Sequence, residues 1–207
     1  LGQVRHGFLL FQRRPRMLEL RAMLSGTVSQ VIGNRGVRIS TMGTLVQGVW
    51  GSGREGDGQI RIFTSSTKGV PSENEFHDAR GAIVVAGHLP TEKLIEAAEE
   101  YGARGFIVGS VTMDVYLTAR NYSIPVLVTD GVGQRPMTKP IYALLNKMQG
   151  EEACILARPM DGHRPEMIIP RLNAVPDVEE LPLDIPLSRG QRVRILQAPH
   201  HSKIGTV

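Results

Sequence analysis

The chain has 207 residues, and its 24 Lys and Arg against 20 Asp and Glu give a formal net charge of +4. A hydrophobic share of 41% and a charged share of 21% exclude a disordered tail protein and leave length for one large domain or two to three small ones. The single cysteine, Cys154, excludes a disulfide scaffold and a cysteine-based zinc site and predicts a reducing, cytoplasmic location, and no apolar run approaches the roughly 20 residues that span a bilayer.

The charge is distributed unevenly along the chain. Residues 1–40 contain seven basic residues and one acidic residue, and residues 188–207 contain four basic residues and no acidic one. These segments carry +6 and +4, so the middle of the chain carries −6. Because the first residue is Leu1 and the last residues lie inside a predicted strand, we expect the chain to be part of a longer protein.

Residues 17–78, which follow a basic N-terminal segment at residues 1–16, form a β-rich region. Short runs with β-branched residues, such as 45–49 and 60–63, alternate with glycines. This spacing predicts a small β-barrel or sandwich domain. Asn34-Arg35-Gly36 predicts a hairpin turn with Gly36 in the left-handed conformation.

A glycine string in the same region matches the pattern G-x-G-x-x-G at Gly51, Gly53 and Gly56. A dinucleotide site would require a helix to follow these glycines. Residues 59–63 instead alternate like a strand, so we interpret the string as a hairpin loop.

Residues 20–28, followed by Gly36, Val37 and residues 43–45, resemble the opening of biotinyl/lipoyl-type barrel-sandwich hybrid domains. The resemblance implies a barrel-sandwich fold for this region. Carrier domains of this kind present a lysine on a tight hairpin, whereas no lysine occurs here before Lys68. We therefore keep the implied fold and reject a swinging-arm carrier function.

Residues 79–157 show the pattern of a parallel α/β domain. Continuous apolar runs at 81–86, 105–109 and 124–128 predict strands that are buried on both faces, and residues 153–156 predict a fourth. Helical periodicity separates these runs after Pro90 and after Pro140. Repeated strand–helix units predict a small parallel sheet with right-handed crossovers.

Polar residues stand where three of these strands end. His88, Ser110 and Asp130 would lie at the carboxyl edge of the sheet, where such folds bind ligands, in the order expected of a base, a nucleophile and an orienting acid. The motif that would support a hydrolase is absent, because Gly109-Ser110-Val111-Thr112 lacks the second glycine of G-x-S-x-G. The alternative is that Ser110 caps a helix and that Asp130-Gly131 forms a turn.

The loop at residues 130–138 is a second candidate site. It connects a predicted strand to a helix N-terminus and contains Gly131, Gly133, Arg135 and a capping Thr138. Backbone N–H groups together with Arg135 would hold an anion there. The alternative is a structural loop or a contact surface between domains.

Residues 158–186 form a proline-rich linker, in which residues 167–169 predict an added edge strand. Residues 187–207 resemble the KOW motif of SH3-like barrels, through Gly190, Val193, Ile195, a turn at Pro199 and an exit at Gly205-Thr206-Val207. The resemblance covers about 20 residues, so the barrel would be partial. It implies binding to RNA or to a protein partner, for which the basic residues of the segment are the candidates: Arg189, Arg192, Arg194 and Lys203.

Two functions follow from these patterns. The first is a non-enzymatic, multidomain binding or scaffold protein whose basic, β-rich ends contact nucleic acid or an acidic protein partner. The second is an α/β domain that binds a small molecule or anion at the carboxyl ends of its strands, with hydrolase activity as a variant. We predict no cofactor and no metal site, and the three-part order resembles a bacterial protein rather than a known enzyme.

Overall fold

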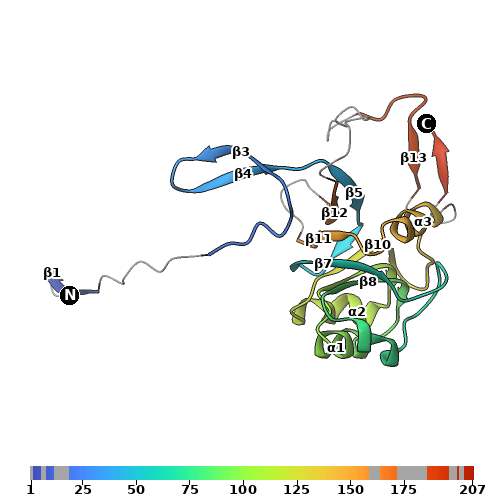
Figure 1. Cartoon of the computed structure of the whole chain (residues 1–207), viewed down its shortest axis with the longest axis horizontal. Coiled ribbons are helices and arrows are strands. Elements are labelled where there is room, and N and C mark those ends of the chain that lie inside the picture. The colour runs from blue at the N-terminus through green and yellow to red at the C-terminus, as the bar shows by residue number, and fades with distance from the viewer. Residues whose placement is uncertain are drawn as a thin grey trace.

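One mixed sheet of eight strands organises the molecule (Figure 1). The computed structural model describes residues 19–158, 164–171, 186–195, 200 and 203–207, together with the backbone of β1 (Gly2–Arg5) and β2 (Phe8–Phe11). The strand order is β5-β12-β11-β7-β8-β9-β10-β6. In chain order these strands are β5 (Gly43–Gln47), β6 (Trp50–Gly51), β7 (Glu55–Ile62), β8 (Ala82–Leu89), β9 (Gly105–Val111), β10 (Val126–Val132), β11 (Glu152–Leu156) and β12 (Glu166–Pro170).

The centre of the sheet is parallel, as the apolar runs at 81–86, 105–109 and 124–128 predict, whereas the fourth predicted strand, β11, runs antiparallel to β7 and β12. Strands β7, β8, β9 and β10 run parallel to one another, and Phe106 of β9 pairs with Val84 of β8 and Val126 of β10. Every residue of β8 and β9 is buried. Strands that are covered on both faces need apolar side chains on both faces, which explains the uninterrupted runs.

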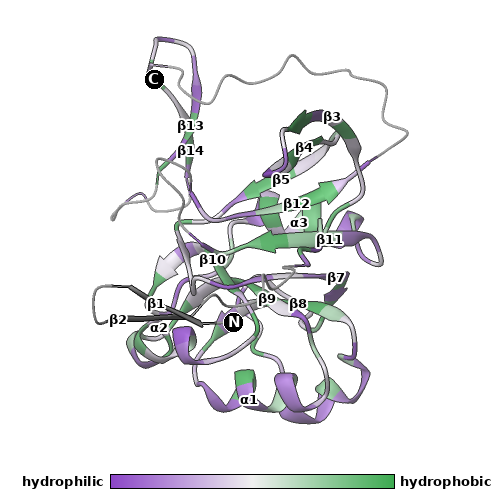
Figure 2. Cartoon of the chain, turned by 90° about the vertical axis from the view of Figure 1, so that its left-hand side faces the viewer, coloured by the Kyte–Doolittle hydropathy of each residue, from purple (hydrophilic) through white to green (hydrophobic). Residues whose placement is uncertain are grey.

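Helices cover both faces of this sheet. Helices α1 (Lys93–Glu100) and α2 (Met113–Thr118), with the 3-10 helices η1 (Glu73–Asp78) and η2 (Ala119–Asn121), pack on one face around Phe76, Phe106 and Val115. Helix α3 (Lys139–Lys147) packs on the other face, where Leu145 joins Ile107. In Figure 2 strands β11 and β12 have largely the hydrophobic colour, whereas α1 has both hydrophilic and hydrophobic segments. The predicted α/β class is therefore confirmed, in the form of a mixed sheet with few helices.

The strands expected in a small barrel or sandwich at residues 17–78 divide between two sheets. Strands β3 (Thr27–Ile32) and β4 (Gly36–Ser40) form a separate antiparallel hairpin that projects from the molecule (Figure 1). Strands β5, β6 and β7 belong to the large sheet. The hairpin turn lies where it was predicted, but Gly33 (φ 49°) adopts the left-handed conformation and not Gly36.

Two further expectations concern the C-terminal half. Strand β12 pairs with β11 on one side and β5 on the other, so it is an inner strand and not the edge strand predicted from its sequence. Strands β13 (Arg192–Arg194) and β14 (Ile204–Thr206) form an antiparallel pair. The side chains of the basic segment 1–16, most of the proline-rich linker and the turn at Pro199 lie outside the described residues.

Candidate ligand-binding site at the carboxyl edge of the sheet

The structure brings the three predicted polar residues to one edge of the sheet. Because β8, β9 and β10 are parallel, their carboxyl ends lie together, and the register pairs His88 with Ser110 and Ser110 with Gly131. The side chains are deeply buried, with 7% exposure at His88, none at Ser110 and 2% at Asp130. These polar side chains therefore lie in the core, where buried polar groups need hydrogen-bond partners.

A segment from an earlier loop closes over this edge. The backbone amides of Gly87 and His88 both donate to the Gly69 carbonyl, at 2.9 and 3.0 Å, and the Met137 amide donates to the Thr67 carbonyl at 2.7 Å. A Cβ at Gly87 would lie 2.4 Å from the Thr67 oxygen, so the close approach depends on that glycine. The segment brings Lys68 and Val70 to the site, although no sequence motif marks them.

The hydrogen bonds of Ser110 determine which nitrogen of the neutral His88 ring carries the hydrogen. The Ser110 hydroxyl donates to the Arg135 carbonyl at 2.6 Å and accepts from the Arg135 amide at 3.1 Å. Since its single proton is used in this way, the 2.8 Å contact with His88 Nδ1 requires Nδ1–H to donate to Ser110 Oγ. The neutral ring therefore carries its free lone pair on Nε2.

This proton arrangement is the reverse of the one a hydrolase needs. A catalytic histidine accepts the proton of the serine hydroxyl, whereas here Nδ1 donates to that hydroxyl. Within the described part of the chain, neither ring nitrogen of His88 bonds to Asp130: Nδ1 contacts Ser110, and Nε2 has no partner. The predicted residues meet at one edge, but they do not form a triad.

Asp130 binds both the N-terminus of α3 and strand β13. Its Oδ2 accepts from the Thr138 amide at 3.0 Å and from Thr129 Oγ1 at 2.7 Å, and its Oδ1 accepts from Thr138 Oγ1. Arg194 Nη1 in β13 lies 3.3 Å from Oδ1, with side-chain exposures of 21% for Arg194 and none for Asp130. The N-terminus of α3, predicted to hold an external anion, thus receives a carboxylate of the chain itself.

Beside these contacts lies a cavity of about 450 Å³, which we call the edge pocket. Lys68 and Arg135, which line it, are cationic, and among the described residues no acidic side chain lines it. Gly131 (φ 115°) has a left-handed backbone conformation at the start of the loop. Arg135 Nη1 lies close to it, 4.0 Å from the position that a Cβ on Gly131 would occupy. The described residues that line it are Lys68, Val70, His88, Gln134, Arg135 and Pro136.

Of the loop residues predicted to bind an anion, only Arg135 lines the pocket. Gly131 and Gly133 (φ 103°) have backbone conformations that favour glycine and shape the loop, whereas Thr138 binds Asp130. Lys68 was missed because it comes from a segment more than 60 residues before the loop.

His88 is the buried polar group of the edge pocket. Burial lowers its pKa below the ordinary value of 6.5, although the hydrogen bond with the Ser110 backbone raises it. The ring is therefore neutral near pH 7, and its Nε2 is buried without a hydrogen-bond partner among the described residues. The imidazole that carries this acceptor lines the pocket together with two cationic side chains.

The lowered pKa of His88 predicts how stability depends on pH. As pH falls below 6.5, the unfolded imidazole takes up a proton while the folded one stays neutral to a lower pH. The unfolded state then binds more protons, so the free energy of unfolding should fall with pH until the folded pKa is passed. Urea unfolding of wild type and His88→Gln at several pH values measures this, and the variant should show the shallower profile. His77→Gln, which removes an exposed imidazole, is the comparison variant. Coincident profiles for wild type and His88→Gln would contradict the assignment.

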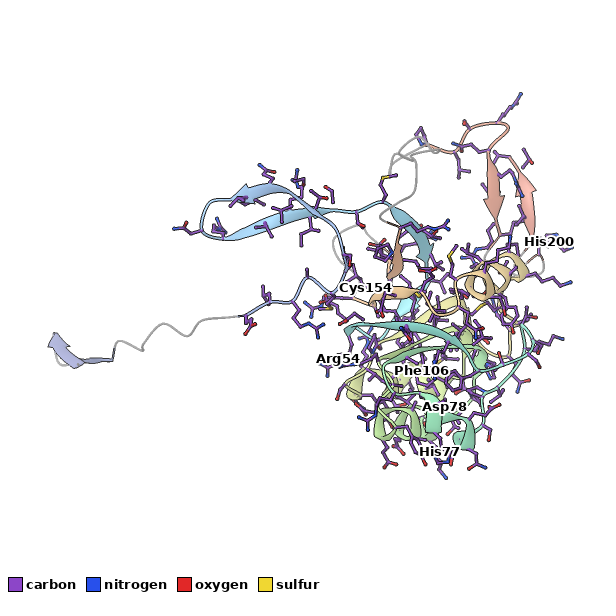
Figure 3. All side chains as sticks on the ribbon, in the orientation of Figure 1. Arg54, His77, Asp78, Phe106, Cys154 and His200 are labelled. Carbon is purple, nitrogen blue, oxygen red and sulfur yellow. The ribbon has the colours of Figure 1, made fainter. Side chains whose placement is uncertain are left out.

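The single thiol takes no part in the site. Cys154 lies in β11 and is completely buried (Figure 3). Burial first, and the negative charges of Asp57, Glu55 and Glu166 second, raise its pKa to about 11. The thiol is protonated at neutral pH and is unsuited to nucleophilic attack.

A larger cavity, of about 930 Å³, lies between residues 21–25 and strands β7, β11 and β12. Its charges are mixed, because Arg21 pairs with Asp57 at 3.3 Å and Arg171, Glu151 and Glu152 also line it. It therefore presents both signs of charge to a ligand.

The basic residues predicted to contact a partner in residues 187–207 separate into two groups. Arg189, Arg192 and Lys203 are exposed, whereas Arg194 is half-buried against Asp130. Arg194 thus attaches β13 to the α/β domain. In the described part of the chain, no group of three or more His, Cys, Asp or Glu could hold a metal ion.

No protein-family model matches the chain, and no curated protein matches it in sequence. None of the helices in the described ranges is long and apolar enough to cross a membrane.

Proposed function

We propose that the chain is a binding protein whose α/β domain takes up a small anion in the edge pocket. The observation that carries this proposal is the lining of the pocket, in which the described residues include the cationic Lys68 and Arg135 and no acidic side chain. An anion placed there would exchange hydration for two charged donors, which are stronger than neutral ones. The reversed hydrogen bond between His88 and Ser110 speaks against hydrolysis at the same place.

Calorimetric titration with inorganic phosphate tests this proposal. Wild type should bind, and Arg135→Gln or Lys68→Gln should each weaken binding about tenfold, because each removes one charged donor. Lys147→Gln is the matched control, since Lys147 is an exposed lysine at the end of α3 and does not line the pocket. Equal binding by all three variants would contradict the proposed site.

A second candidate function is nucleic-acid contact through the basic ends, favoured by the exposure of Arg35 and Arg38 on the β3–β4 hairpin and of Arg189 and Arg192 near β13. None of these four has an ion-pair partner among the described residues. Their charges are free to meet phosphates, and the same surface would suit an acidic protein partner.

Salt dependence distinguishes this function from unspecific association. Binding to a labelled RNA, followed by fluorescence anisotropy, should weaken steeply with KCl, because phosphate contacts release counterions. The double variant Arg189→Gln/Arg192→Gln should reduce the slope of log affinity against log salt by about two. An RNA affinity that changes neither with the KCl concentration nor with the substitutions would contradict nucleic-acid contact.

A further inference from the structure

We propose that the edge pocket selects anions that carry a hydrogen-bond donor beside the charge. This inference rests on the proposed function, and it names the chemical class of the ligand for that site. The class comprises hydrogen phosphonates and phosphate monoesters that keep one proton, and 2-hydroxycarboxylates. Sulfonates and simple carboxylates have comparable charge but no donor, so they belong outside the class.

The hydrogen bonds that connect Arg135, Ser110 and His88 can run in only one direction. The Arg135 carbonyl can only accept, so Ser110 donates to it, at 2.6 Å. Ser110 Oγ must then accept from His88 Nδ1, at 2.8 Å. Nδ1 carries the ring hydrogen as a result, and Nε2 of the neutral ring is an acceptor.

This acceptor is unsatisfied within the described part of the chain. Nε2 of His88 is buried and has no hydrogen-bond partner, and the side chain that carries it lines the pocket. A buried acceptor without a partner is unfavourable, so a ligand that donates to it gains more than one that does not. A ligand that presents only oxygen lone pairs would meet the Nε2 lone pair and be repelled.

The remaining lining sets the charge and size of the ligand. Lys68 and Arg135 require an anionic group, whereas Val70 and Pro136 offer apolar contact to a short hydrocarbon part. The volume of about 450 Å³ suits a small molecule. Charge, donor and small size together define the class.

Two pairs of probes test the donor directly, by calorimetric titration of the full chain near pH 7. Methylphosphonate and methanesulfonate have the same shape, but only the first keeps a proton, and glycolate differs from acetate by one hydroxyl. Wild type should bind each donor-bearing member about tenfold tighter than its donor-free partner. In His88→Gln the preference should shrink to less than about threefold, because an amide can present a donor as well as an acceptor. His77→Gln should keep the wild-type preference.

A spectroscopic measurement on wild type avoids dependence on the folding of the variant. In protein labelled with ¹⁵N-histidine, His88 Nε2 should show the resonance of an unprotonated nitrogen, and this resonance should move on addition of methylphosphonate but not of methanesulfonate. If all four probes bind equally, the proposed function stands and the donor selection is wrong. Tighter binding of the donor-free members, or a protonated Nε2, also overturns the selection. If none of the probes and no phosphate binds, both proposals fail.

Discussion

Replacing Asp130 by alanine should lower the free energy of unfolding by about 3–5 kcal/mol, because the substitution removes an acceptor that is shared by four donors among the described residues. The amide and hydroxyl of Thr138, the hydroxyl of Thr129 and the guanidinium of Arg194 would all lose this partner. The first turn of α3 would also lose its negative charge. Urea unfolding followed by circular dichroism measures the change.

Asp114→Ala is the matched control, because Asp114 stands in the first turn of α2 but is exposed. It should change the free energy of unfolding by less than about 0.5 kcal/mol. Arg194→Ala should fall between the two, since Thr129 and Thr138 still donate to Asp130. A loss for Asp130→Ala as small as that of the control would contradict the buried network.

Replacing Phe106 by alanine should lower the free energy of unfolding by a similar amount, about 3–5 kcal/mol. The ring has no solvent exposure, lies within the α/β part of the molecule (Figure 3) and meets Phe76 edge to face, with ring centroids 6.1 Å apart. Its removal would leave a cavity between η1 and the centre of the sheet, which the flanking strands cannot close without breaking their register with β9.

Chemical unfolding of Phe106→Ala measures this loss, with Leu117→Ala as the comparison. Leu117 lies on α2 with 66% of its surface exposed, so its truncation should cost less than about 0.5 kcal/mol. A loss below about 1 kcal/mol at Phe106 would show that the ring does not belong to the core.

Local patterns predicted the part of the fold in which neighbouring residues carry the signal. The apolar runs that became β8 and β9 are buried throughout, and the helical face after Pro90 became α1 with Leu94, Ile95 and Ala98 buried. The polar residues at the strand ends were placed at one edge by the geometry of parallel sheets alone. These inferences need only periodicity and the direction of the chain.

Strand partners could not be predicted in the same way. The sequence of β5 or β12 fits an edge strand, an inner strand or a small barrel equally well, because strand patterns record which face is buried and not which neighbour is present. The structure joins β12 to β5 across more than 100 residues, which removes β5 from the expected barrel.

The amino-acid sequence was sufficient to establish the α/β class, the parallel core and the candidate edge with His88, Ser110 and Asp130. Only the tertiary structure decided what these side chains do. Ser110 binds the backbone of Arg135 and accepts from His88 Nδ1, which leaves the free lone pair of the ring on Nε2. Asp130 binds Thr138 and Arg194. The reason is physical. Residue types define which hydrogen bonds are available, but the direction of each bond depends on partners that are distant in sequence and that folding brings within 3 Å or so.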